Sequence, residues 1–310
     1  MSGRISSIAI YAAILAVGLG VAFSGQPFWI QLTIGVMIPA MVAIAWDILS
    51  RTGQVTLGSA AFFGIGTYSV TLFEPLVGPH FAWLAAVIMC AVVAMLLGLL
   101  TLRLRKMYFA IATLGLTLSM QVAVLVFSDV TGGAGGISPP LLMGGEPSHQ
   151  LVAITVLLLG AAMVSDYFLS RRMRPALFLV RTNPSLAAAS GIAVVRLRVI
   201  AFMVSGVLAG IGGACYGGLY GYVVPTDVFN MNWSVLPLAI AILGGMDTTL
   251  GPLLGAALLR ALEELARHYV GGVGYQVVYG AVIILFVVTM PTGVVGVLKK
   301  LAGWARSLSR

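Results

Sequence analysis

The chain has 310 residues, of which 60% are hydrophobic and only 8% are charged. Soluble domains carry about 25% charged residues, so most of this surface cannot face water. The formal net charge of +8 comes from basic residues in short loops between apolar runs, so it gives no reason to expect nucleic-acid binding. The apolar runs have the length of membrane-spanning helices, and the short alternating segments of an outer-membrane barrel are not visible.

The predicted fold class is therefore all-α, a polytopic membrane protein with about eight to ten transmembrane helices in one domain, residues 1–310. The first run is longer than the apolar region of a signal peptide, so we interpret it as an uncleaved span. Three candidates are short, glycine-rich or amphipathic and are candidates for broken or re-entrant helices: 55–73, 233–246 and 251–268. The other candidate spans are 5–23, 28–49, 81–102, 107–127, 149–169, 197–219 and 275–297.

The basic residues predict the orientation. If the N-terminus lies in the cytoplasm, all 17 Lys and Arg residues except Arg260 and Arg267 lie on the cytoplasmic side. This predicts cytoplasmic N- and C-termini, a cytoplasmic loop at 170–196 and a glycine- and proline-rich outer loop at 128–148.

Charged residues within the spans are spaced to pair with one another. Glu263 and Arg267 lie four residues apart, as do Arg260 and Glu264. We interpret this amphipathic segment as an interfacial helix or the watery end of a span rather than a substrate site, which is the alternative. Asp47 and Arg51 have the same spacing, and we expect a structural pair at the interface.

The segment 52–73, "TGQVTLGSAAFFGIGTYSVTLF", is rich in small residues. Such residues let helix backbones approach closely in lipid, where the hydrophobic effect does not drive helices together. We predict a packing motif formed by Gly53, Gln54, Gly58, Gly64, Gly66 and Tyr68.

This segment resembles the membrane-spanning subunits of bacterial ABC importers for branched-chain amino acids. Ser59 stands where that family commonly has His. The resemblance continues in order through "LRLRKMYFAIATLGLT", "TGGAGGI", "ILGGMDTTLGPLLGAALL" and "VVYGAVIILFVVTMPTGVVG", with Asp247 where Gly is usual. It covers about residues 35–297. The outer glycine-rich loop and the length favour the M-type subunit over its H-type sister.

A short helix with its own end signals is predicted in the cytoplasmic loop. Asn183 suits the N-cap, Pro184 suits the first helical position, and Gly191 suits the left-handed position after the C-terminus. The alanines between them favour a helix of about two turns.

The segment "RTNPSLAAASGI" resembles the coupling helix that, in this family, docks in a cleft of the ATPase subunit. The resemblance implies ATPase contact by residues 181–187 and Gly191, with Thr182 where an acidic residue is usual. The alternative is an ordinary capped surface helix. The residues concerned are Arg181, Thr182, Asn183, Pro184, Ser185, Leu186, Ala187 and Gly191.

Candidates for the substrate path are polar residues on two spans. Thr113, Thr117 and Gln121 recur every four residues and form one stripe, which either lines the path or makes hydrogen bonds between helices. Tyr216 and Tyr220 share a face of another span, and packing is the favoured interpretation for them.

The chain has no phosphate-binding loop motif and no credible catalytic triad, so we expect it not to be an enzyme. It also has no residue spacing typical of a metal site.

The resemblance implies a permease subunit in the inner membrane, translocating leucine, isoleucine or valine, with urea, short amides or aromatic carboxylates as alternatives. It implies an H-type permease partner, two ATPase subunits that bind ATP and Mg²⁺, a periplasmic or lipid-anchored substrate-binding protein, and membrane lipid around the helices. Our hypothesis is that part of loop 128–148 receives the binding protein, and the alternative is a simple flexible connector. The chain itself is expected to hold no cofactor. An ion-coupled secondary transporter is the alternative of another class, disfavoured because nearly every charge maps to a span end.

Overall fold

A computed structural model describes residues 2–101, 106–270, 280–281 and 293–297. Within these ranges the chain is almost entirely helical, and the only β-type pairing is an isolated bridge between Ile137 and Val223. The all-α class is confirmed. Residues 275–297, predicted to form the last span, lie mostly outside the described residues.

Five long helices form the first part of the chain. They are α1 (Ser2–Ser24), α2 (Pro27–Ser50), α3 (Ser59–Val77), α4 (Pro79–Thr101) and α5 (Lys106–Val126). Three short helical turns follow in the predicted outer loop, namely α6 (Ser128–Thr131), η1 (Gly133–Gly135) and η2 (Leu142–Gly145).

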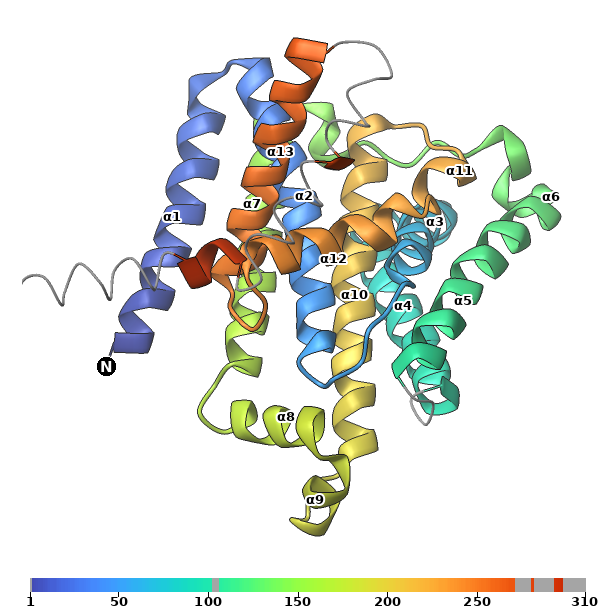
Figure 1. The fold of residues 1–310 in the computed structure, drawn as a ribbon. Coiled ribbons are helices and arrows are strands. Elements are labelled where there is room, and N and C mark those ends of the chain that lie inside the picture. The colour runs from blue at the N-terminus through green and yellow to red at the C-terminus, as the bar shows by residue number, and fades with distance from the viewer. Residues whose placement is uncertain (1, 102–105, 271–279, 282–292, 298–310) are drawn as a thin grey trace, which may run out of the picture.

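The second part begins with α7 (Pro147–Phe168) and continues with two short helices, α8 (Met173–Thr182) and α9 (Pro184–Ala189). The long α10 (Val194–Tyr220) crosses the bundle, and α11 (Pro225–Val228), α12 (Asn232–Gly244) and α13 (Leu250–Val270) complete the described chain. In Figure 1 the N-terminal end of α1 and the α8–α9 segment lie toward the same end of the bundle, as the predicted orientation requires.

Seven segments of the described chain are long and apolar enough to cross a membrane. They comprise α2, α3, α4, α5, α7, α10 and the run from α11 through α12. The described apolar part of α1 is shorter, and α13 carries several charges. On α13 the predicted pairs form, since Arg260 lies 2.9 Å from Glu263 and 4.0 Å from Glu264, and Arg267 lies 2.7 Å from Glu263.

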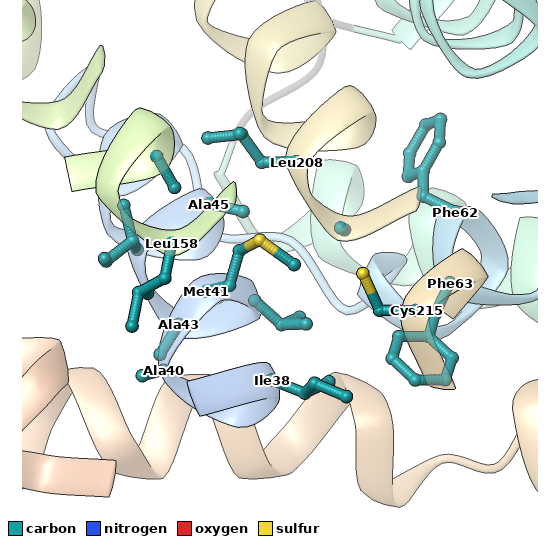
Figure 2. Packing of buried hydrophobic residues seen from close by; sticks show 14 of the residues in the cluster. Ile38, Ala40, Met41, Ala43, Ala45, Phe62, Phe63, Leu158, Leu208 and Cys215 are labelled. Atoms are coloured by element: carbon teal, nitrogen blue, oxygen red, sulfur yellow. The ribbon is translucent and has the colours of Figure 1, made fainter. Parts of the chain in front are cut away.

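The core is built where α2, α3 and α10 meet. A Cβ added at Gly66 of α3 would overlap the carbonyl oxygen of Gly210 of α10, and one at Gly213 would overlap that of Phe63. The two backbones therefore touch, as small residues permit in lipid. Figure 2 shows apolar residues from α2, α3, α7 and α10 that share this core, among them Met41, Phe63 and Leu158.

The predicted span 55–73 begins later than expected, because residues 51–58 are irregular and α3 starts at Ser59. Most of this irregular stretch is buried, so its backbone needs partners inside the protein. The carbonyl of Thr56 accepts from the Trp46 indole at 3.0 Å, and the N–H of Leu57 donates to Thr113 Oγ1 at 3.0 Å. The helix itself runs from Ser59 to Val77 as one element, so the irregular backbone lies before the span rather than inside it.

The loop 128–148, predicted to lie on the outer side, has local structure of its own. The N–H of Ile137 donates to the carbonyl of Val223 at 2.9 Å, and the reverse bond measures 3.0 Å. Tyr222 donates its hydroxyl to the carbonyl of Gly135 at 2.5 Å. These bonds fix the glycine-rich segment to the chain that follows α10.

Candidate functional site

The α8–α9 segment is the most distinctive feature at the lower end of the bundle in Figure 1. In α8 the side chains of Leu177 and Val180 are buried, three residues apart on one face. Arg174 and Phe178 on the same helix are exposed. The sequence predicted a loop around the capped helix here, and α8 was not predicted. Met173 packs half-buried on the same core, so the apolar face extends over positions 173, 177 and 180.

Helix α9 has the ends that the sequence predicts. Asn183 Oδ1 accepts the N–H of Leu186 at 3.0 Å, and Pro184 occupies the first helical position. After the helix, Gly191 has a φ of +80°, and the N–H of Ile192 donates to the carbonyl of Ala187 at 3.0 Å. The predicted capped helix is confirmed.

The exposed surface of α9 is made of small side chains and one large apolar one. Ala187 is buried against the rest of the chain, whereas Leu186 is 52% exposed. Ser185 is also exposed. Thr182, where the resemblance predicts an acidic residue, donates its hydroxyl to the carbonyl of Phe178 at 2.8 Å and adds no charge.

Arg181, at the junction of α8 and α9, pairs with an aspartate from a distant part of the sequence. Its Nη1 lies 3.1 Å from Oδ1 and 2.9 Å from Oδ2 of Asp247, in the loop between α12 and α13. Asp247 has a φ of +61°, which is uncommon for residues other than glycine. Gly53 lies beside this pair, where an added Cβ would meet the Arg181 Cα at 3.1 Å.

A buried polar network continues from Asp247 into the bundle. The N–H of Asp247 donates to Asp47 Oδ1 at 3.0 Å, and Asp47 Oδ2 accepts from Arg51 Nη2 at 2.5 Å. Arg51 also donates to the carbonyl of Ser165 at 2.9 Å and to its hydroxyl at 2.8 Å. The predicted Asp47–Arg51 pair forms, but it is buried rather than interfacial, because α7 and the α12–α13 loop cover it.

The network ends at α1. The hydroxyls of Ser165 and Thr249 lie 3.2 Å apart, and Thr249 hydrogen-bonds Asp166 Oδ1. Asp166 Oδ2 in turn accepts from the Tyr11 hydroxyl at 2.6 Å. One continuous set of polar contacts thus joins α8 to four other parts of the bundle: α1, α2, α7 and the α12–α13 segment.

A cleft of about 500 Å³ separates part of α8 from the bundle. Its lining includes Phe168 at the end of α7 and Leu169 after it, together with Arg174 and Phe178 of α8. Arg51, Pro175, Leu177, Arg181 and Asp247 complete the lining. The Arg181–Asp247 pair therefore lies at a place where α8 is not packed tightly on the membrane helices.

The polar stripe on α5 lies against the irregular segment before α3. Thr113 and Thr117 are buried, and the Thr117 hydroxyl lies 3.5 Å from the carbonyl of Leu57. Thr113 accepts a hydrogen bond from the Leu57 N–H, so both threonines contact the backbone of Leu57. Gln121 is half-buried. Their part in a substrate path stays a prediction.

The two tyrosines of α10 belong to an aromatic cluster. The ring of Tyr216 lies 5.5 Å from Phe63, 5.4 Å from Trp233 and 4.7 Å from Tyr220. Tyr220 is 66% exposed, so the cluster leads from the α3–α10–α12 core to the surface. The rings of Phe63 and Trp233 stack with centroids 4.0 Å apart, a contact that was not predicted because the two residues are 170 positions apart in the chain.

The remaining residues of the predicted packing motif lie along α3 and just before it. Gly58 faces Thr113, and Gly64 faces the ring of Phe229. Gln54 and Tyr68 are buried, 2% and 4% exposed, beside this packing.

Comparison with known proteins agrees with the arrangement. Residues 28–287 match the family described as "Branched-chain amino acid transport system / permease component". The high-affinity branched-chain amino acid transport system permease protein LivM of Escherichia coli (strain K12) is 28% identical over 278 residues, covering 79% of this chain. The corresponding LivH of Salmonella typhimurium (strain LT2) is 23% identical over 205 residues, covering 62% of this chain and 65% of LivH.

The chain spans 64% of the length of the LivM proteins that it matches. No solved structure matches it.

Proposed function

Because the chain belongs to the branched-chain amino acid transport permease family, we propose that it is one membrane-spanning subunit of an ATP-driven importer in the bacterial inner membrane. The single observation that carries the ATP-driven part is α9, a capped helix that projects from the end of the bundle where the chain begins. The substrates proposed are leucine, isoleucine and valine, as the names of the relatives suggest.

In this proposal α9 is the contact for an ATPase subunit. Leu186 offers an exposed apolar side chain for a cleft in the partner, while Ala187 anchors the helix to its own subunit. The cap at Asn183 and the turn at Gly191 hold this short helix in shape, which a six-residue peptide could not do alone. Closing of two ATPases around ATP and Mg²⁺ would then move α9 together with α8.

The partner subunits follow from the same proposal. The similarity to LivM is greater than to LivH, so this chain takes the M-type role and pairs with an H-type permease. The translocation path lies between the two permeases, with Thr113, Thr117, Gln121, Tyr216 and Tyr220 as candidates to line it. A substrate-binding protein delivers the amino acid to the outer face, and part of the ordered loop 128–148 receives it.

The test is co-expression with the H-type permease, the ATPases and the binding protein, followed by purification and reconstitution. We expect a stable complex whose ATPase rate rises when the binding protein carries leucine. Stimulation by urea, a short amide or an aromatic carboxylate instead would move the substrate assignment to that class. Recovery of the chain alone, with transport driven by an ion gradient and indifferent to ATP, would support a secondary transporter.

A cysteine placed at Leu186 provides a direct test of the docking contact. Both native cysteines, Cys90 and Cys215, are buried, so a bifunctional thiol reagent should react mainly at the new site. We expect crosslinking to an ATPase subunit from position 186 and none from a cysteine at the outer residue Tyr220. Absence of any ATPase adduct from position 186 in an intact complex would refute the docking of α9.

A further inference from the structure

We propose that Asp247 is a positioning residue for the coupling helix: its ion pair with Arg181 fixes the α8–α9 segment to the membrane helices and makes ATPase movement drive them. This inference rests on the proposed function. It assigns a role to a residue that stands where the resembling family usually has glycine.

Asp247 makes two connections in different directions. Its main-chain N–H donates to Asp47 Oδ1 at 3.0 Å, and Asp47 is completely buried in α2. Both oxygens of its carboxylate accept from Arg181 Nη1, Oδ2 at 2.9 Å and Oδ1 at 3.1 Å. A movement of Arg181 is therefore passed to the buried Asp47–Arg51 pair and, through Ser165, to α7.

The other contacts of α8 with the bundle are apolar. Leu177 and Val180 are buried, and Met173 packs half-buried against the same core. On the cleft side, about 500 Å³ of open space lies between α8 and the end of α7. Among the described residues, Arg181–Asp247 is the one ion pair that joins α8 to the rest of the bundle, so it is the charged contact that fixes the position of this helix.

The strength of the Arg181–Asp247 ion pair suits a contact that opens and re-forms during the proposed ATPase cycle. The side chains of Arg181 and Asp247 are 35% and 45% exposed. Ion pairs exposed to this extent shift an equilibrium by roughly two- to fivefold, and they are weakened by salt. The pair is therefore strong enough to bias the position of α8–α9 and weak enough to open and re-form.

The backbone of Asp247 allows the connection to be tested apart from stability. With a φ of +61°, this position is one that glycine adopts more readily than aspartate. The Asp247→Gly change therefore removes the ion pair while relieving the backbone. Asp247→Asn removes the charge and keeps a side chain that tolerates this conformation.

The experiment measures substrate transported per ATP hydrolysed by the complete reconstituted complex. We expect both Asp247→Asn and Asp247→Gly to lower this ratio by roughly two- to fivefold, with ATP hydrolysis maintained. The matched control is Arg174→Gln, which removes an arginine of α8 that lines the same cleft but has no ion pair among the described residues. It should leave the ratio unchanged.

The inference is overturned if both Asp247 variants keep the wild-type ratio, or if transport and hydrolysis fall in proportion, as a purely structural role predicts. Either result leaves the proposed function standing, because that function fails only if no complex with an ATPase forms or if transport ignores ATP.

Discussion

The Asp47→Asn variant isolates the contribution of the buried pair at the end of α2. Asp47 is 0% and Arg51 is 3% exposed, and the guanidinium contacts the same carboxylate oxygen through Nε at 3.1 Å and Nη2 at 2.5 Å. An amide at position 47 removes the neutralising charge, so the arginine charge stays buried among neutral acceptors, namely the amide oxygen and Ser165. Removing one partner of a buried ion pair costs about 3–5 kcal/mol.

The expected loss is large enough to measure in detergent. At about 2 °C per kcal/mol for a chain of this size, the midpoint of thermal unfolding should fall by roughly 6–10 °C. The assay is thermal unfolding of the purified chain followed by fluorescence and by loss of monodisperse protein. The matched control is Glu263→Gln on α13, whose pairs are partly exposed and contribute under about 1 kcal/mol.

The double replacement Asp47→Leu with Arg51→Met tests the same reasoning from the other side. It removes both charges together, so much of the stability lost in Asp47→Asn should return. The reasoning is refuted if Asp47→Asn unfolds within about 2 °C of Glu263→Gln, since the buried charge would then cost no more than an exposed one.

Three further substitutions test the packing and the caps. Gly66→Ala places a methyl group on the Gly210 carbonyl and should destabilise the chain by about 1–3 kcal/mol, whereas Gly115→Ala, with open space at its Cβ, should not; thermal midpoints compare them. Asn183→Ala should weaken α9 by about 1 kcal/mol and lower ATPase stimulation, and a full effect of Asn183→Asp, which keeps the cap, would contradict this. Thr113→Val leaves the Leu57 N–H without its acceptor and should cost about 1–3 kcal/mol, seen as a lower thermal midpoint; an unchanged midpoint would show that water or another group replaces it.

The local features of the fold could be predicted from the sequence because their causes are local. Runs of about 20 apolar residues predict spanning helices whatever surrounds them, and α2, α4, α5, α7 and α10 follow the predicted ranges closely. The cap at Asn183 and the turn at Gly191 likewise depend on neighbouring residues alone. These helices and helix ends could therefore be predicted without information on tertiary contacts.

The features that were missed depend on residues far apart in the chain. Nothing in the sequence places Asp247 against Arg181, 66 residues away, or Asp47 against the backbone of Asp247. The start of α3 was expected four residues too early, because the irregular segment before it is held by side chains of other helices. The aspartate at position 247, where the resembling family usually has glycine, was visible in the sequence. Its ion pair with Arg181 could be recognised only from the structure.

The central claim is that this chain carries a substrate across the membrane using ATP hydrolysed by a partner. Its most direct test is uptake of radiolabelled leucine into proteoliposomes that hold the complete complex, with loaded binding protein outside and ATP enclosed. We expect uptake that requires enclosed ATP and persists when ion gradients are collapsed by ionophores. Equal uptake with and without ATP, or uptake abolished by the ionophores alone, would contradict the account.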